Sequence, residues 1–228
     1  MDFKYLGVNV LEQLDSSINY NNYLKKRLKS NLKDKSNVLD FGTGLGTMSS
    51  MLKEENIEAK CVEIDRDLKT RLESLGFTVK ADIGEYTDGS FSFIYSLNVL
   101  EHIEDDFKTL RDMYTKLKPS GVLYLYVPAF NVLYSSFDKK VGHYRRYSKG
   151  NLRDLLIKSG FEIKKSEYVD SLGFFAALAY KLLGNKSGDL DSSKVRFYDK
   201  FIFPISKKLD FFFSGFLGKN LEFVAVKK

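Results

Sequence analysis

The sequence predicts one α/β domain on a Rossmann-like, seven-stranded, mostly parallel sheet, with helices on both faces and a helical cap inserted between strands six and seven. Three observations lead to this fold class. Short apolar segments alternate with helix-like segments, a glycine-rich stretch follows the first apolar segment, and acidic residues end the next two. Alternating strands and helices form parallel sheets that bind ligands at the carboxyl ends of their strands.

The first half of the chain is predicted to form three helices and four strands. Apolar residues at helical spacing predict a helix within the N-terminal helical segment, residues 1–34; they are Tyr20, Leu24, Leu28 and Leu32. Short apolar and β-branched runs predict strands over residues 36–42, 59–65, 77–83 and 91–98. Helical patterns connect the first three strands over residues 45–55 and 66–76.

The second half continues the alternation. A helix is expected where Ile103, Phe107, Leu110, Tyr114 and Leu117 share one face, and "KPSG" at residues 118–121 ends it. Strands are predicted over residues 122–128 and 161–169, with a helix over residues 151–160 between them. These elements complete a core of residues 35–170, and residues 219–228 form the last strand of this single domain.

The segment between strands six and seven is too long for a loop, so residues 171–218 are predicted to form the cap. Two helix-like stretches in it flank a polar link, residues 184–194, that we expect to move. The "FFF" at residues 211–213 is expected to pack in the core of the cap. Membrane anchoring is the alternative, because Lys207 and Lys208 lie close by.

Composition bears on location and partners. The one cysteine, Cys61, excludes an intramolecular disulfide and suits a reducing compartment. The N-terminal residues do not look like a signal peptide, and the longest apolar run, residues 172–183, is shorter than the ~20 residues that span a bilayer. We therefore expect a cytoplasmic protein, with peripheral membrane contact open to the basic, aromatic cap.

Charge is divided unevenly along the chain. Residues 1–137 carry 17 basic and 20 acidic residues, a net charge of −3, whereas residues 138–228 carry 19 and 10, a net charge of +9. The second part also holds 16 of the 33 aromatic residues. A solvated surface would explain the charge alone, but basic and aromatic residues together suit an anionic or amphipathic partner.

The glycine-rich stretch "VLDFGTGLGTM" carries the first ligand signal. Asp40 precedes a loop that contains Gly42, Thr43, Gly44 and Gly46, where a strand gives way to a helix. Such a loop lets a ligand approach backbone N–H groups and the helix N-terminus. The dinucleotide fingerprint needs a sixth-position glycine, but Thr47 stands there, which argues against a nicotinamide-dependent oxidoreductase.

Acidic residues at the next two strand ends extend the signal to a nucleoside. Glu63, with Ile64 and Asp65 beyond it, is placed to accept both hydroxyls of a ribose. Asp82 is placed to accept from an adenine amino group, with Ile83 beside it as an apolar contact. A surface carboxylate is the alternative for Glu63, and a helix N-cap is the alternative for Asp82.

Several motifs together resemble the class I S-adenosylmethionine-dependent methyltransferases, in the ubiquinone/menaquinone-type and small-molecule group. They are "NYNNYLKKRL", "VLDFGTGLGT", "VEID", "FSFIYSLNVLEHIEDD", "LKPSGVLYLYVPAF" and "VGHYRRYSKGNLRDLLIKSGFEI". The resemblance covers residues 19–170 and the last strand. It departs at Ser92, where the family commonly has Asp, and it does not extend to the cap.

The resemblance implies a cofactor and the residues that bind it. The cofactor is S-adenosylmethionine, and residues 35–170 form its binding core. Asp40 and the loop of residues 42–46 would hold the methionine part, and Glu63 the ribose, with Ile64 next to it. Asp82 and Ile83 would hold the adenine, and Asn98 with Leu100 would line the methyl end.

Two histidines and a basic loop are the candidates for acceptor chemistry. His102 is either a base near the methyl group or a residue of the first helical turn, and His143 is either a base or a surface residue. Tyr144, Arg145, Arg146 and Tyr147 form a plausible fork for a phosphate or carboxylate, although the arginines could simply be solvated. No metal site is predicted.

The resulting hypothesis is a methyltransferase that modifies a small-molecule or lipid- or glycan-linked acceptor, anionic in character and modified at oxygen. A non-catalytic module that only binds S-adenosylmethionine is the alternative. No nucleic-acid partner is expected, because strand four ends in "NVLE" rather than in an "NPPY"-type turn, and Cys61 lies inside a predicted strand. The sequence does not predict an oligomeric state.

Overall fold

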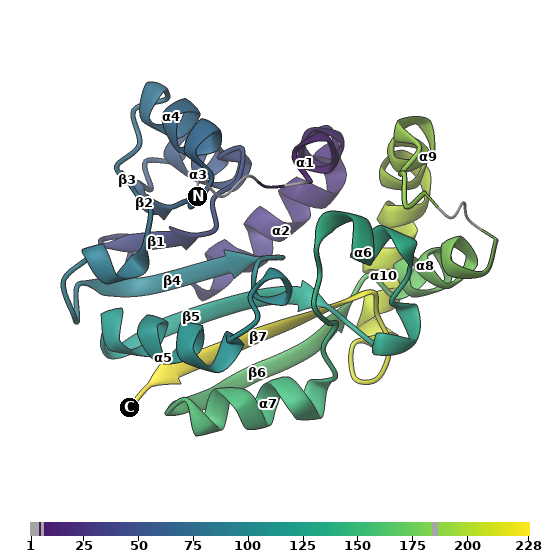
Figure 1. The fold of residues 1–228 in the computed structure, drawn as a ribbon. Coiled ribbons are helices and arrows are strands. Elements are labelled where there is room, and N and C mark those ends of the chain that lie inside the picture. Colours follow the sequence, from purple (N-terminus) through teal and green to yellow (C-terminus); the bar gives the residue numbers. More distant parts are fainter. Residues whose placement is uncertain (1–4, 6, 184–186) are drawn as a thin grey trace.

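The computed structural model describes residues 5, 7–183 and 187–228. Seven strands form one sheet in the order β3-β2-β1-β4-β5-β7-β6 (Figure 1). All neighbours run parallel except β7, which lies antiparallel between β5 and β6. This confirms the predicted fold class. The strands are β1 Val38–Phe41, β2 Ala59–Val62, β3 Val79–Lys80, β4 Phe91–Leu97, β5 Leu117–Pro128, β6 Phe161–Val169 and β7 Asn220–Lys227.

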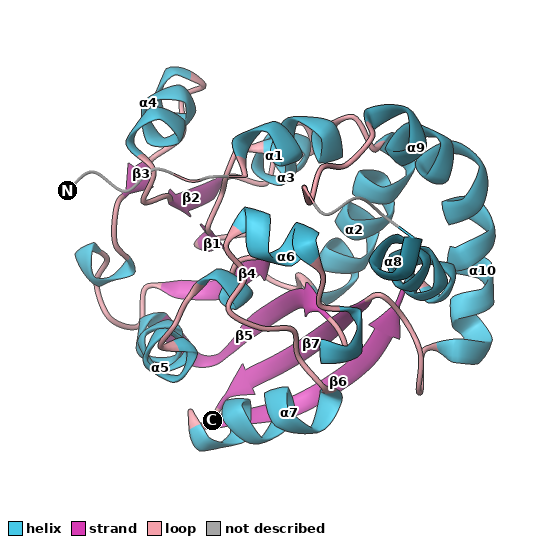
Figure 2. Cartoon of the chain, turned by 45° about the vertical axis from the view of Figure 1, so that its right-hand side comes forward, coloured by secondary structure: helices cyan, strands magenta, loops and turns pink. Residues whose placement is uncertain are grey.

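Helices cover both faces of the sheet (Figures 1 and 2). Helices α2 (Ile18–Asn31) and α3 (Thr47–Lys53) pack on one face, and α5 (Asp106–Lys116) and α7 (Lys149–Lys158) pack on the other. Helix α4 (Arg66–Ser74) packs against β2 and β3. Successive strand residues point to opposite faces, so Ile94 of β4 joins the core under α5 and α7 while Phe93 joins the core under α2 and α3.

Two boundaries around α5 differ from the sequence prediction. The helix begins at Asp106 rather than near Ile103, because Asp105 caps it by accepting the Lys108 N–H at 2.9 Å. Strand β5 begins at Leu117, which pairs with Phe91, but pairing with β4 then shifts and resumes only at Val122. The predicted helix end before "KPSG" is confirmed, and the loop appears as a bulge within β5 rather than a separate turn.

The cap consists of helices α8 (Ser171–Leu183), α9 (Ser192–Phe197) and α10 (Phe203–Phe213), which lie between β6 and β7 in the chain. A π-helical turn, η4 (Tyr198–Ile202), connects α9 to α10. Residues 184–186 of the predicted polar link lie outside the described residues. Figure 2 shows α8, α9 and α10 gathered at one end of the sheet, beside α2.

Buried carboxylates tie the cap to the core. Asp199 accepts the backbone N–H groups of Asn19 and Tyr20, at 3.0 and 2.8 Å, where α2 begins. Asp210 accepts those of Asp170 and Ser171, at 2.9 and 2.8 Å, where β6 gives way to α8. Each bond satisfies an amide that begins a helix or leaves a strand, so the cap helices are fixed to the sheet by charge-assisted hydrogen bonds.

The prediction that residues 211–213 pack in the core of the cap was wrong for two of them. Phe211 and Phe212 are 84% and 70% exposed. Helix α10 turns Phe203, Ser206 and Asp210 inward, since these residues hold the cap to the sheet, and this leaves the phenylalanines on the outer face. Among the described residues, no helix is long and apolar enough to cross a membrane.

Candidate functional site

The glycine-rich loop joins β1 to α3 at the carboxyl edge of the sheet. Gly42 has a φ of 77°, which favours glycine, and a Cβ there would lie 2.4 Å from Val99 Cγ2. The N–H groups of Gly42 and Thr43 donate to the Val62 carbonyl, at 2.9 and 3.1 Å. The loop is therefore held between the end of β2 and the segment after β4, with no room for a side chain at Gly42.

Glu63 connects this loop to the end of β2. Its carboxylate accepts the Gly44 N–H at 2.8 Å and the Asp65 N–H at 2.9 Å. Burial raises its pKa, although these two hydrogen bonds act against the rise. Asp65 instead caps α4 by accepting the N–H groups of Asp67 and Leu68. Glu63 is thus the acidic side chain that contacts the glycine loop, and its contact with a ribose stays a prediction.

Asp40 lies beneath the loop and is 4% exposed. Ser49 of α3 donates to its Oδ2 at 2.7 Å, and the Tyr95 hydroxyl lies 2.9 Å from the same Ser49 oxygen. Burial raises the pKa of Asp40 to about 7, against the effect of these hydrogen bonds. Asp40 therefore holds α3 against β1 through Ser49, which also contacts Tyr95 of β4. Its contact with the methionine part of a cofactor stays a prediction.

The residues predicted around the adenine divide into two groups. Asp82 caps the short helix η1 (Ile83–Glu85) by accepting the Gly84 N–H at 2.6 Å, which was the alternative reading; its adenine contact stays a prediction. Ile83 is 4% exposed and packs in the core beneath α5, so the predicted apolar contact with adenine was wrong. Ile64, 60% exposed, is the apolar side chain that remains available near Glu63.

The end of β4 carries one of the two residues predicted at the methyl end. Asn98 has a φ of 54°, its N–H donates to Tyr126 O at 2.7 Å, and its Oδ1 accepts from Asn220 Nδ2 at 3.3 Å. The Leu100 side chain is fully buried in the core, because the chain turns inward into the 3-10 helix η2 (Leu100–His102). The prediction that Leu100 lines the methyl end was therefore wrong for its side chain.

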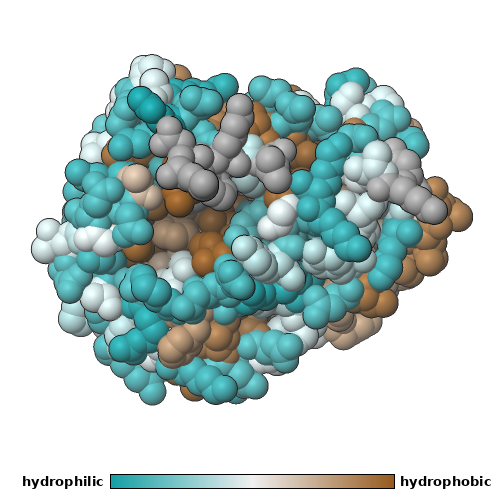
Figure 3. Space-filling view, in the orientation of Figure 1, coloured by the Kyte–Doolittle hydropathy of each residue, from teal (hydrophilic) through white to brown (hydrophobic). Residues whose placement is uncertain are grey.

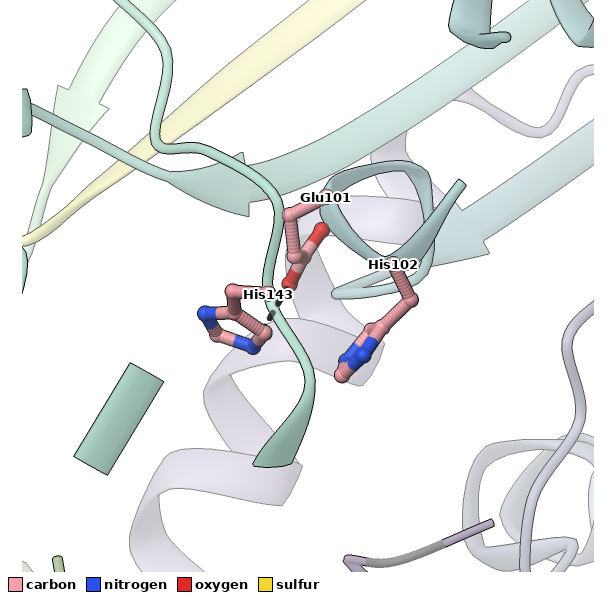
Figure 4. Close-up of side chains that lie close together, drawn as sticks. All are labelled: Glu101, His102 and His143. Carbon is pink, nitrogen blue, oxygen red and sulfur yellow. Dashed lines mark ion pairs between the residues drawn. The ribbon is translucent and has the colours of Figure 1, made fainter. Parts of the chain in front are cut away.

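His102 and His143 come together directly after β4 (Figure 4). Their ring centroids are 4.5 Å apart, and Glu101 lies beside them with Oε1 3.8 Å from His143 Nε2. Glu101 is fully buried, and burial raises its pKa to about 8. Burial and the neighbouring His143 lower the pKa of His102 to about 4, so His102 is neutral and a weak base at pH 7.

Asp138 of helix α6 (Ser136–Val141) orients His143. Its Oδ1 lies 2.7 Å from His143 Nδ1, and its two oxygens also accept from Arg146 Nε at 2.8 Å and Nη2 at 3.0 Å. Burial raises the pKa of Asp138, but hydrogen bonds from His143 and Arg146 outweigh this and lower it to about 2. The carboxylate is ionised, so His143 Nδ1 donates to it and Nε2 faces Glu101 and His102.

The basic loop after His143 is held in place by carboxylates. Arg146 is 8% exposed and paired with Asp138, and Arg145 donates to Asp106 Oδ2 at 2.7 Å. Tyr147 is buried and donates to the same Asp106 oxygen at 2.9 Å. The fork predicted for an anionic acceptor is thus already occupied within the protein, which gives these three residues a positioning role. Tyr144 is 55% exposed, and its acceptor contact stays a prediction.

Tyr5 and helix α1 (Val8–Asp15) contact this region, which sequence reasoning missed. The Tyr5 N–H donates to Asp65 Oδ2 at 2.8 Å, and its ring packs edge-on against His102, 5.3 Å between centroids. Leu11 of α1 lies over Gly44, 3.3 Å from where a Cβ would stand. Figure 3 shows a hollow with hydrophobic and pale walls on this face of the molecule.

Sequence reasoning also missed Glu101 and Asp138. Glu101 directly precedes His102 in "LEHIEDD", so its buried position beside two histidines had a local signal. No local sequence signal marked Asp138. Its pairing with His143 and Arg146 depends on the turn that ends α6 at Gly142, which has a φ of 83°.

Comparison with known proteins places this site in a family. A family model described as a methyltransferase domain matches residues 17–166. A solved putative sarcosine dimethylglycine methyltransferase from Galdieria sulphuraria is 17% identical, with a TM-score of 0.63 over 92% of this chain and 86% of that one. A SAM-dependent methyltransferase from Archaeoglobus fulgidus is 22% identical, with a TM-score of 0.61 over 91% and 94% of the two chains.

One curated relative is also similar in sequence. Ribosomal RNA small subunit methyltransferase A of Fusobacterium nucleatum is 26% identical over 182 residues, which is 74% of this chain. The chain spans 62% of that relative's length.

The strand order, the glycine loop and the acid at the end of β2 define a class I methyltransferase fold, a class of enzymes that use S-adenosylmethionine. The chain belongs to the methyltransferase domain family, since the model matches about two thirds of its residues.

Proposed function

We propose that this protein transfers a methyl group from S-adenosylmethionine to an oxygen atom of a small-molecule or lipid- or glycan-linked acceptor. The observation that carries the proposal is the Asp138–His143 pair. Its free nitrogen, Nε2, faces the segment directly after β4, where the methyl end of the cofactor is predicted. A histidine oriented by a carboxylate is a common general base.

In this mechanism the sulfonium supplies an electrophilic methyl group, and the protein aligns an acceptor oxygen in line with the S–CH₃ bond. His143 Nε2 takes the hydroxyl proton as the O–CH₃ bond forms and the S–CH₃ electron pair returns to sulfur. Asp138 stabilises the imidazolium that results. Such base catalysis contributes ~10²–10⁴-fold in rate. His102 is the weaker candidate, because its pKa is lowered to about 4.

The surface of the cap supports a lipid-linked, anionic acceptor. Its exposed apolar side chains include Phe175, Phe197, Phe201, Phe211 and Phe212. Basic residues of the same helices are interspersed with them, among them Lys200, Lys207 and Lys208. In Figure 3 a hydrophobic surface lies at the right-hand edge, over α8 and α10. Apolar rings next to lysines suit the headgroup region of an anionic membrane.

RNA is the competing acceptor, because the curated relative is a ribosomal RNA methyltransferase. The sequence after β4 argues against it, since "NVLE" differs from the "NPPY"-type turn of amino-directed enzymes. A module that binds the cofactor without transferring the methyl group is the other competitor. An RNA methyltransferase would methylate RNA, and a binding module would bind the cofactor without methylating any acceptor, so both differ from a base-assisted O-methyltransferase in a transfer assay.

The test begins with calorimetric titration of S-adenosylmethionine and S-adenosylhomocysteine, with NAD as a control. We expect the first two to bind and NAD not to bind. Transfer of a radiolabelled methyl group to phenolic, prenyl-phosphate and RNA acceptors then identifies the acceptor class. His143→Ala should keep cofactor binding and lower transfer by ~10²-fold or more. Methylation of RNA alone would refute the proposed acceptor, and methylation of neutral soluble acceptors alone would refute its anionic, lipid-linked character.

A further inference from the structure

Glu101, His102 and His143 form a cluster that base catalysis does not need as a whole. One carboxylate oxygen and one nitrogen from each ring all lie within 4.8 Å of one another (Figure 4). Glu101 and His102 come from η2 after β4, and His143 comes from the loop after α6. The sequence shows no short motif with the spacing of metal ligands, since His143 is far along the chain from Glu101 and His102. Only the fold brings the two segments together.

Glu101 is the unusual member of the cluster. Its side chain is fully buried, and neither carboxylate oxygen has a hydrogen-bond partner in the part of the chain that the structure describes. A buried carboxylate without partners is costly, so buried acids are usually paired or bound to metal ions. His143 Nε2 lies 3.8 Å from Glu101 Oε1, which is too far for a hydrogen bond. The Glu101 carboxyl group therefore lacks a hydrogen-bond or metal partner among the described residues.

The surroundings of His143 match those of a metal-binding histidine. Its Nδ1 donates to Asp138, which two nitrogens of Arg146 hold in turn. Metal-bound histidines usually donate their second ring N–H to a carboxylate, which fixes the ring and directs the other nitrogen to the metal. Here that other nitrogen, Nε2, faces Glu101 and His102.

We propose that Glu101, His102 and His143 bind one divalent transition-metal cation of the Zn²⁺, Mn²⁺ or Fe²⁺ class. Two imidazoles and one carboxylate suit these ions, whereas Mg²⁺ and Ca²⁺ prefer oxygen ligands. Ligand atoms around a tetrahedral ion lie about 3.4 Å apart for metal–ligand bonds of about 2.1 Å. The cluster therefore needs to contract by at most about 1.4 Å from the 4.8 Å observed.

Three protein ligands leave coordination positions open, which is typical of catalytic rather than structural sites. The catalytic use of the ion rests on the proposed function. An ion held there would make an acceptor hydroxyl more acidic, as such ions do for bound water. The O–CH₃ bond would form as the S–CH₃ electron pair returns to sulfur, and the hydroxyl proton would pass to solvent. In this arrangement His143 Nε2 would hold the metal, so in the metal-bound protein the ion would activate the acceptor, and in the metal-free protein the imidazole would act as the base.

Binding is tested on the full chain without an acceptor. Protein treated with a chelator is titrated with Zn²⁺, Mn²⁺ and Co²⁺ by calorimetry, and the Co²⁺ protein is followed by its visible absorption spectrum. We expect one equivalent of metal to bind, with a Co²⁺ spectrum of nitrogen and oxygen ligands. Glu101→Gln should weaken binding at least 10-fold. Asp138→Asn should weaken it ~10–100-fold, the usual effect of losing such a supporting carboxylate.

Glu104→Gln is the matched control, because Glu104 is an exposed acid on the same loop. It should leave binding unchanged. Absence of a stoichiometric metal in the wild type, or equal affinity in the wild type and Glu101→Gln, would overturn the proposal. Titration of S-adenosylhomocysteine into the same metal-free samples separates the two ideas: retained nucleoside binding without metal binding leaves the proposed function intact and removes the metal site.

Discussion

The cofactor side and the acceptor side of the site are built in different ways. Around the glycine loop, backbone N–H groups and a nearby acid make the contacts, as Gly44 and Glu63 do. On the acceptor side, buried charged side chains from distant segments pair with one another, as Arg146 does with Asp138 and Arg145 with Asp106. Substitutions on the cofactor side should therefore affect mainly binding, whereas substitutions on the acceptor side should affect folding stability as well.

The largest effect is expected at Asp138. Asp138→Ala leaves both Arg146 and His143 buried without their partner, and breaking such a pair costs ~3–5 kcal/mol of the free energy of unfolding. Urea denaturation at pH 7 measures it. Asp189→Ala is the control, because Asp189 pairs with Lys140 on the surface and should change stability by less than ~0.5 kcal/mol. Equal urea midpoints for Asp138→Ala and Asp189→Ala would contradict the expected difference between buried and surface ion pairs.

Glu63→Ala should act on binding instead. Losing a carboxylate that accepts charge-assisted hydrogen bonds from a ribose should cost ~1.5–3 kcal/mol of affinity for S-adenosylhomocysteine. Calorimetry measures this loss, and Glu58→Ala, at an exposed acid before β2, serves as the control. If Glu63→Ala binds as tightly as the wild type, Glu63 only connects the glycine loop to β2 and the ribose assignment fails.

Asp40 gives the cofactor side a pH dependence. Its pKa is raised by burial to about 7, so the folded state holds a proton that the unfolded state has lost above pH ~4. This group therefore lowers stability as the pH rises from ~4 to about 7, by up to ~1.4 kcal/mol per pH unit. Asp40→Asn keeps an acceptor for Ser49 and should remove this part of the slope. Parallel stability curves for variant and wild type between pH 5 and 7 would contradict the prediction.

The smallest effect on stability is expected on the cap. Changing both Phe211 and Phe212 to serine should alter the free energy of unfolding by less than ~0.5 kcal/mol, because both side chains are exposed. The same change should reduce sedimentation with vesicles that contain phosphatidylglycerol, while neutral phosphatidylcholine vesicles serve as the control. Undiminished sedimentation would show that another surface binds the lipid.

Sequence reasoning reached the sheet, the glycine loop and Glu63 because each depends on neighbouring residues and on a regular alternation of strands and helices. It misplaced Ile83 and Leu100, since the direction of a side chain at a strand end depends on the following 3-10 turn. It also offered Arg145 and Arg146 as a fork for the acceptor. Their carboxylate partners, Asp106 and Asp138, are recognisable only once the fold places them.

The position of β7 between β5 and β6 bears on how this chain folds as it leaves the ribosome. Until β7 is synthesised, β5 and β6 have no strand between them. The hydrogen bonds of Arg27 and Tyr124 to Glu222 also cannot form until β7 is present. Glu222 accepts from Arg27 at 2.8 Å and from Tyr124 at 2.6 Å. A nascent chain that ends before Asn220 thus carries unpaired buried groups and two open strand edges, so chaperone contact is expected to last until the final strand inserts.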